Sequence, residues 1–227
     1  MIGIFDSGVG GFTALYEVRR LVPRADILYL ADRANAPYGT KSDGELISLV
    51  TEDIRRLTAL GAEKILIACC TASTVWESLD EGARRLSIPI IRPAANAAAR
   101  LSANGIAVIA TEATVRSHSF AREISSLSPH IPVSEIAAQE LVSLVEGGCR
   151  DGRVKEEDMK ILSATAEKIN KTKADTLILG CTHFSHLEKT LSALTGTRAI
   201  SPAKEGARLI VKECATAANG RGRTVYV

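Results

Sequence analysis

Residues 65–71 are Ile-Leu-Ile-Ala-Cys-Cys-Thr, and residues 177–182 are Leu-Ile-Leu-Gly-Cys-Thr. Each stretch is an apolar run of strand length, followed by cysteine and then by a threonine suited to opening a helix. The order strand, Cys, Thr therefore occurs twice in one chain. The match is short, and it suggests two similar α/β units.

The rest of the chain alternates short β-branched runs with amphipathic stretches. Apolar residues recur at helical spacing over 12–21, 47–57 and 159–169, and Ser42 and Glu45 have capping-box spacing before the second stretch. Such alternation predicts parallel sheets, which bind ligands at the carboxyl ends of their strands. The expected strands are Ile2–Phe5, Ile27–Leu30, Lys64–Ala68, Ile88–Ile91, Ile106–Ile109, Val133–Ile136 and Thr176–Leu179.

We therefore predict an α/β fold of two similar parallel-sheet lobes with the active site in the cleft between them. Pro93 is the expected crossing into the second lobe, and Ser201-Pro202 the expected return. The predicted lobe one is 1–93 plus 203–227 with the first cysteine, and lobe two is 94–202 with the second. The tail Thr224–Val227 would add a strand to lobe one.

Composition excludes several classes of function. The chain has 227 residues, 46% hydrophobic and 4% aromatic, with a net charge of +2. Charges are scattered, so we expect neither a nucleic-acid nor a membrane partner. We see no signal peptide and no apolar run of membrane-spanning length, which favours a cytoplasmic protein. An odd number of cysteines, five, without a C-x-x-C pair, favours neither a disulfide framework nor a zinc site.

The stretch Phe5–Gly11 follows the first expected strand and holds three glycines in four positions. Its amides could form an anion-binding nest at the start of a helix, as in nucleotide-binding proteins. The dinucleotide fingerprint, however, needs glycine where Thr13 stands. Asp32 could imitate the ribose-binding acid of that fingerprint. The simpler interpretation is a tight turn with a helix cap.

Two cysteines in matching places favour a chemical function over packing. Each would lie at a helix amino terminus, where the dipole favours a thiolate, and His183 adds a titratable neighbour two residues after Cys181. A cysteine nucleophile, dithiol redox chemistry and proton transfer on two faces of one carbon all fit these residues. The near-symmetric placement of Cys69 and Cys181 favours proton transfer. We interpret His118, His130 and His186 as surface or packing residues.

Six segments along the chain, in order, resemble the motif set of the glutamate racemases, within the aspartate/glutamate racemase family. The ordered set is highly specific, although Pro37–Gly39 alone would be taken for a turn. Cys181-Thr182-His183 resembles the glutamate racemases, whereas aspartate racemases have Glu after the Thr. The six segments are Phe5–Gly11, Pro37–Gly39, Ala68–Ala72, Ala110–Val115, Leu144–Glu146 and Gly180–Phe184.

The resemblance implies a two-base enzyme without cofactor or metal, acting on glutamate as its small-molecule substrate. It implies an enzyme of the cytoplasm that supplies D-glutamate for peptidoglycan, and hence for cell-wall biogenesis and cell shape. A homodimer is the oligomeric state that it suggests. Cys69 and Cys181 would exchange the α-proton, with Asp6 assisting the first, His183 the second and Glu146 supporting that side. The expected substrate-binding positions are Asp6, Ser7, Tyr38, Gly39, Cys70, Thr71, Thr182 and His183.

Two residues depart from the family pattern. Cys70 stands where the family has Asn, and Ser185 where it usually has Pro. A hydroxyl such as that of Ser73 could compensate for the missing amide. The first departure leaves open a racemase of aspartate or another acidic amino acid, and a non-catalytic amino-acid-binding relative. Retention of Cys69 and Cys181 argues against the latter, as Thr13 argues against a nucleotide-binding module.

Overall fold

The computed structural model describes residues 1–214 and 220–227. Residues 215–219, part of the predicted lobe one, lie outside the described residues. The contacts divide the chain into two compact units, Met1–Pro93 with Ala203–Val227 (lobe one) and Ala94–Pro202 (lobe two). Each lobe is described by itself below.

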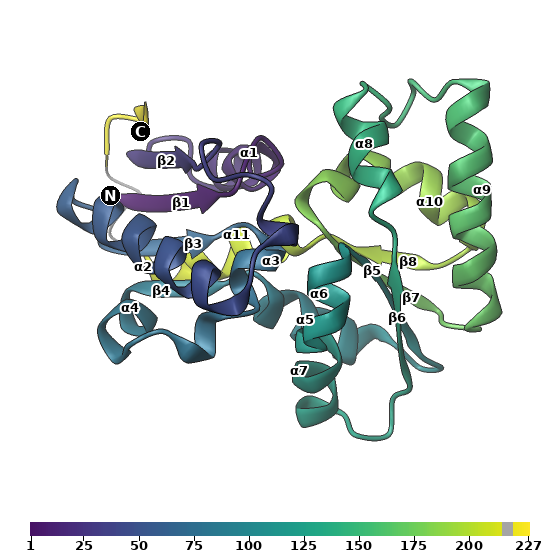
Figure 1. Cartoon of the computed structure of the whole chain (residues 1–227). Helices are drawn as coiled ribbons and strands as arrows, with labels where there is room; N and C mark the ends of the chain where they lie inside the picture. Colours follow the sequence, from purple (N-terminus) through teal and green to yellow (C-terminus); the bar gives the residue numbers. More distant parts are fainter. Residues whose placement is uncertain (215–219) are drawn as a thin grey trace. The chain divides into compact units, whose positions relative to one another are not determined.

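Lobe one contains a sheet in which every pairing is parallel (Figure 1). Its strand order is β4-β3-β1-β2-β9, so the chain starts in the middle of the sheet and winds to both sides. The strands are β1 (Ile2–Asp6), β2 (Ile27–Ala31), β3 (Lys64–Ile67), β4 (Ser87–Pro89) and β9 (Thr224–Tyr226).

Lobe two contains a second all-parallel sheet, in the order β6-β5-β7-β8. Read in reverse, from β8 to β6, this order matches β4-β3-β1-β2 of lobe one. The first four strands of each lobe therefore occupy equivalent places. The prediction of two similar parallel-sheet lobes is confirmed. The strands are β5 (Ile106–Ala110), β6 (Val133–Ala137), β7 (Thr176–Gly180) and β8 (Arg198–Ile200).

Helices connect the strands in both lobes, as parallel pairing requires. The three helices predicted from apolar spacing are present, and Ser42 and Glu45 form the predicted capping box. The α-helices are α1 (Phe12–Leu21), α2 (Asp43–Ala59), α3 (Cys70–Ser73), α4 (Glu81–Leu86), α5 (Ile91–Leu101), α6 (Glu112–Ser117), α7 (Ser119–Leu127), α8 (Glu140–Glu146), α9 (Glu156–Lys171), α10 (Glu188–Thr195) and α11 (Pro202–Glu213). The 3₁₀ helices are η1 (Tyr38–Thr40), η2 (Trp76–Ser78) and η3 (Thr182–Leu187).

Both faces of each sheet are covered, which explains why the strands are apolar without alternation. In lobe one the apolar face of α2 packs on Ile65 and Ile67, whereas Leu66 points to the opposite face, toward Gly206 of α11. In lobe two, Leu177 and Leu179 belong to a core with α8, α9 and α10. Helices on the two faces leave the carboxyl ends of the strands for function.

The predicted strand Ile88–Ile91 is wrong at its end. Strand β4 stops at Pro89 and Ile91 begins α5, which passes from lobe one to lobe two. Pro93 lies in the first turn of this helix, where a missing N–H costs nothing. Strand β8 was not predicted, because Arg198–Ile200 is only three residues long.

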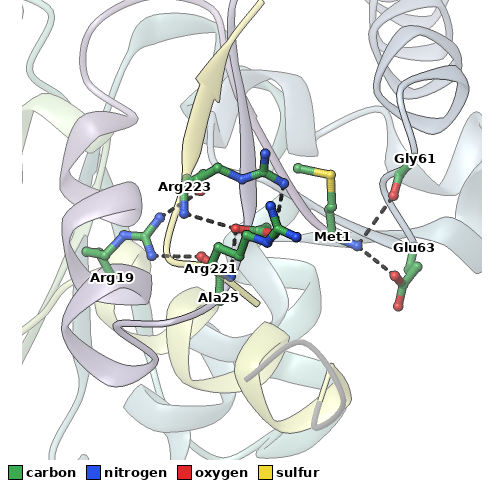
Figure 2. A network of polar contacts seen from close by, with 8 residues as sticks. Met1, Arg19, Ala25, Gly61, Glu63, Arg221 and Arg223 are labelled. Carbon is green, nitrogen blue, oxygen red and sulfur yellow. Dashed lines mark hydrogen bonds and ion pairs between the residues drawn. The ribbon is translucent and has the colours of Figure 1, made fainter. Parts of the chain in front are cut away.

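The prediction of a C-terminal strand is confirmed for Thr224–Tyr226, which pairs with β2 in parallel. Arg19 of α1 holds the approach to this strand, donating to the carbonyls of Ala25 at 2.7 Å and Arg223 at 3.1 Å (Figure 2). The guanidinium group of Arg19 thus stabilises an edge strand of only three residues.

None of the helices in the described parts of the chain combines the length and hydropathy needed to cross a membrane.

Gly3 and Gly44 test how tightly lobe one is packed. A Cβ on Gly3 would lie 2.8 Å from Cγ1 of Ile65, whereas one on Gly44, in α2, would meet nothing within 4 Å. We expect Gly3→Ala to lower the free energy of unfolding by about 1–3 kcal/mol through overpacking. Gly44→Ala should leave it unchanged or raise it by up to about 1 kcal/mol. Urea unfolding of both variants checks this; equal effects would contradict the packing analysis.

Candidate active site

Strand pairing places Cys69 beside Asp6 at the carboxyl edge of the first sheet. Phe5 of β1 is in register with Ile67 of β3, and Ala68 N–H donates to Phe5 O at 2.8 Å. Cys69 is the N-cap residue of α3, and its sulfur accepts from Ala72 N–H at 3.4 Å. The predicted position of this cysteine, between strand and helix, is confirmed.

The helix start favours a thiolate at Cys69, as expected, but its effect is outweighed in the free protein. Burial and the charge of Asp6 raise the pKa of Cys69 to about 11, although hydrogen bonds from Ser7 and Ala72 oppose the shift. The Ser7 hydroxyl lies 3.4 Å from the sulfur. A helix of four residues carries too little dipole to outweigh desolvation beside a buried carboxylate.

The glycine stretch after β1 encloses Asp6. Gly8 N–H donates to Oδ2 of Asp6 at 2.9 Å, and a Cβ on Gly11 would lie 2.4 Å from that of Asp6. The glycines therefore let the chain fold over its own carboxylate, which occupies a nest amide that a phosphate would need. This geometry disfavours a nucleotide-binding module.

Tyr38 directs its hydroxyl into the interior of lobe one. The hydroxyl oxygen lies 2.7 Å from Oδ2 of Asp32 and 3.1 Å from Oδ2 of Asp53, and all three side chains are buried. Asp32 also accepts from Asn35 at 3.0 Å, so its carboxylate is engaged away from any ribose. The Tyr38 hydroxyl is therefore engaged within lobe one.

One hydroxyl proton cannot satisfy two ionised carboxylates. Burial and the charge of Asp32 raise the pKa of Asp53 to about 7, so a protonated Asp53 can donate to Tyr38, which donates to Asp32. Burial and the two carboxylates also raise the pKa of Tyr38. Sequence reasoning missed Asp53, although a charged residue on the apolar stripe of α2 was a signal for it.

Cys70 and Thr71 follow Cys69 as the first residues of α3, and both are buried. The hydroxyl of Ser73, considered above as a compensation for the missing amide, is engaged with the main chain. Its hydroxyl donates to Ile67 O at 3.2 Å and accepts from Ile90 N–H at 3.1 Å. Ser73 thus joins β3 to the start of α5.

In lobe two the structure brings together three predicted residues. Cys181 directly follows β7, and its sulfur lies 3.6 Å from Nδ1 of His183. Nε2 of His183 lies 3.6 Å from Oε1 of Glu146 and has no hydrogen-bond partner among the described residues. The His183 side chain is 13% exposed and that of Glu146 58% exposed, so this side has access to solvent.

Thr182 opens η3 directly after Cys181 and is buried. The helix expected after this cysteine is a 3₁₀ segment. Ser185, the second departure from the family pattern, shares a hydrogen bond of 2.9 Å with Ser201 and so ties η3 to the end of β8.

The described residues contain no group of three or more His, Cys, Asp or Glu side chains arranged to hold a metal ion. All five cysteines carry free thiols.

Comparison with known proteins identifies the family. The model of the Asp/Glu/Hydantoin racemase family matches residues 16–210. A glutamate racemase of Gloeobacter violaceus is 37% identical over 206 residues, 89% of this chain and 76% of the relative. One of Desulforudis audaxviator is 40% identical over 203 residues, 88% and 72% of the two chains. The chain belongs to the Asp/Glu/hydantoin racemase family.

Solved structures of the family have the same fold. A glutamate racemase from Bacillus anthracis superposes with a TM-score of 0.88 at 28% identity, over 100% of this chain and 86% of that one. One from Francisella tularensis, in complex with D-glutamate, gives 0.87 at 26%, over 99% and 85%. The resemblance of the sequence motifs to those of the glutamate racemases is thereby confirmed.

Asp53 should make lobe one less stable as pH rises. Its pKa is raised from 3.8 to about 7, so the native state binds more protons than the unfolded state within that window. We expect the melting temperature to fall from pH 5 to pH 8, and the fall to be smaller in Asp53→Asn by roughly 5 °C.

Asp43→Asn is the matched control, because Asp43 is an exposed carboxylate on the same helix. Calorimetry of the three proteins at several pH values makes the comparison. Parallel curves for the unmodified protein and Asp53→Asn would show that Asp53 does not hold the proton.

Proposed function

We propose that this protein racemises glutamate by moving a proton between Cys69 and Cys181 without a cofactor. The observation that carries the proposal is topological. Each cysteine follows the third strand of its lobe, and each has its own polar assistant: Asp6 with Ser7, or His183 with Glu146. In the proposed mechanism, one thiol removes the α-proton and the other returns a proton to the opposite face of the same carbon.

The two thiols differ in their polar surroundings. Cys69 is protonated at neutral pH, since its pKa is raised to about 11 by burial and Asp6. Cys181 has an imidazole 3.6 Å away that can take its proton. We therefore propose that Cys181 acts as the base and Cys69 as the acid in the first direction.

In that direction the Cys181 thiolate takes the α-proton and the Cys69 thiol gives its proton to the other face. The products are the opposite enantiomer, a Cys181 thiol and a Cys69 thiolate. Proton exchange with water through His183 and Asp6 resets both sulfurs. The reverse direction starts with Cys69 deprotonated, which a substrate ammonium beside Asp6 would favour by offsetting its charge.

Substrate contacts are proposed at the carboxyl edges of the strands. We assign them to Asp6, Ser7, Cys70 and Thr71, to the main chain of Tyr38 and Gly39, and to Thr182 and His183. Amides and hydroxyls at helix starts can hold carboxylates without an arginine.

Glutamate is favoured by the names of the relatives and by His183 after Thr182. A glutamate racemase of Escherichia coli, solved in complex with L-glutamate and an activator, is 29% identical to this chain. The two superpose with a TM-score of 0.70. Aspartate or another acidic amino acid is the second candidate, because Cys70 replaces an amide. By the same resemblance, we propose that the enzyme acts in the cytoplasm and supplies D-glutamate for peptidoglycan.

Cys69→Ser and Cys181→Ser should each abolish net racemisation. A serine hydroxyl is far too weak a base at neutral pH, so we expect turnover to fall by about 1,000-fold or more. Circular dichroism of L- and D-glutamate solutions follows the reaction. Cys214→Ser is the control, as Cys214 is a buried cysteine that the mechanism does not use.

In heavy water the product should carry deuterium at the α-carbon, with chelator present and no pyridoxal added. Near-normal turnover in either active-site variant, or loss of activity restored by a metal or pyridoxal, would disprove the two-thiol mechanism.

Cys70→Asn should lower the KM for glutamate. A thiol is a weak donor and acceptor, so restoring the amide adds about one hydrogen bond to a charged group, roughly 1.5–3 kcal/mol. We expect KM to fall by about tenfold or more, with Cys69 and Cys181 still required. Initial rates against glutamate and aspartate measure the effect.

Cys70→Ala separates packing from binding, because it removes the thiol without adding an amide. If KM is unchanged or raised in Cys70→Asn, Cys70 is a packing residue and its neighbours bind the substrate. Faster turnover of aspartate than of glutamate by the unmodified protein would favour the second candidate function.

A further inference from the structure

One side chain in lobe two, Asp151, joins the loop after α8 to the segment after Cys181. Its backbone N–H donates to the carbonyl of His186 at 2.7 Å. Its carboxylate accepts from the N–H groups of Lys189 and Thr190, both at 2.9 Å, and from the Thr190 hydroxyl at 2.8 Å. The structure thus gives this loop residue four hydrogen bonds to η3 and α10.

These bonds make Asp151 the cap of a helix to which it does not belong. The N-cap residue of α10 is Leu187, whose side chain makes no capping hydrogen bond. The first-turn amides of a helix need an acceptor, and a negative charge there suits the helix dipole. Asp151 provides both from a different part of the chain.

The loop that carries Asp151 is itself fixed to the end of α8. Cys149 N–H donates to Leu144 O at 2.9 Å, and Arg150 and Arg153 pair across a tight turn with N–H···O distances of 3.3 and 2.7 Å. A displacement of Asp151 would therefore be passed to the end of α8, where Glu146 lies.

We propose that Asp151 is the positioning residue that sets the His183–Glu146 pair beside Cys181. From Asp151, one connection runs back through the turn to Glu146, and the other runs through His186 along η3 to His183. The result is the pair of 3.6 Å separations, from His183 to Cys181 and to Glu146. This role rests on the proposed function, since the pair it positions assists the second thiol.

The charge of Asp151 also acts on His186, which lies on the connection to His183. Burial, Arg150 and His183 lower the pKa of His186, whereas Asp151 opposes them. Asp151→Asn removes the charge and keeps one acceptor oxygen, whereas Asp151→Ala removes the cap altogether. Comparing the two variants separates the effect of charge from that of position.

Asp175 offers a matched control within the same lobe. Its carboxylate also accepts from two loop amides, those of Ala103 at 2.9 Å and Asn104 at 3.0 Å. It precedes β7, whereas Cys181 follows that strand, so it lies at the opposite end of the sheet. Asp175→Ala should destabilise lobe two without displacing His183 or Glu146.

The experiment measures kcat, KM and the pH profile of glutamate racemisation in the full chain, below the melting temperature of every variant. We expect Asp151→Ala to lower kcat by about tenfold with KM within about twofold, because a displaced assistant costs turnover more than binding. Its pH profile should shift, and Asp151→Asn should recover part of kcat. Asp175→Ala should keep the kcat and pH profile of the unmodified protein.

Alkylation by iodoacetamide, resolved by peptide mass, reports on Cys181 without needing turnover. We expect Cys181 to react about threefold more slowly in Asp151→Ala, because the thiolate is the reactive form, with Cys69 unchanged. An unchanged kcat and pH profile, or an equal loss in Asp175→Ala, would overturn the proposal. If the unmodified protein racemises no acidic amino acid, the proposed function fails, and unchanged or faster alkylation of Cys181 would then overturn the role of Asp151 separately.

Discussion

Parallel pairing of the first strand with the third, repeated in both lobes, is the interaction on which the proposed site depends. It sets Phe5 opposite Ile67 in one sheet and Ala110 opposite Gly180 in the other. Carboxyl ends then share one edge, which places Cys69 beside Asp6. A slip of one residue would turn the third strand over and remove the sulfur from that edge. Since both sheet faces are covered, alternation of polarity cannot fix this register, and close packing such as Gly3 on Ile65 does so instead.

The cost of the site is the burial of acidic groups in lobe one. Asp6, Asp32 and Asp53 are all buried. Their carboxyl groups are stabilised in different ways. Asp6 accepts from the main chain of Gly8, and the pKa of Asp53, beside the Tyr38 hydroxyl, is raised to about 7. The neutral Cys69 thiol is a third adjustment, because a second negative charge beside Asp6 would be costly.

Much of this was predictable from the sequence, because strand-length apolar runs and helical spacing depend on local pattern. The strands around Ile65 and Leu177, and the capping box at Ser42, follow directly from such patterns. What could not be predicted depends on tertiary surroundings. The ionisation of Cys69 is decided by desolvation and a carboxylate 63 positions away in the chain, not by the short helix after it. Asp151 carries no sequence signal, since its partners lie on a helix whose own cap residue is leucine.

Cys69 and Cys181 lie in equivalent topological positions but have different polar neighbours. In the proposed mechanism this difference gives the two thiols different roles. In lobe one the sulfur is buried beside the carboxylate of Asp6, which together disfavour a thiolate, although the Ser7 hydroxyl favours it. In lobe two it is accompanied by an imidazole at 3.6 Å and, beyond it, a half-exposed carboxylate. A racemase needs both enantiomers to find one base and one acid. Under the proposed mechanism, two lobes like lobe one would supply two acids and no base. In the proposed mechanism, the different neighbours of Cys69 and Cys181 therefore let one fold, used twice, supply one acid and one base.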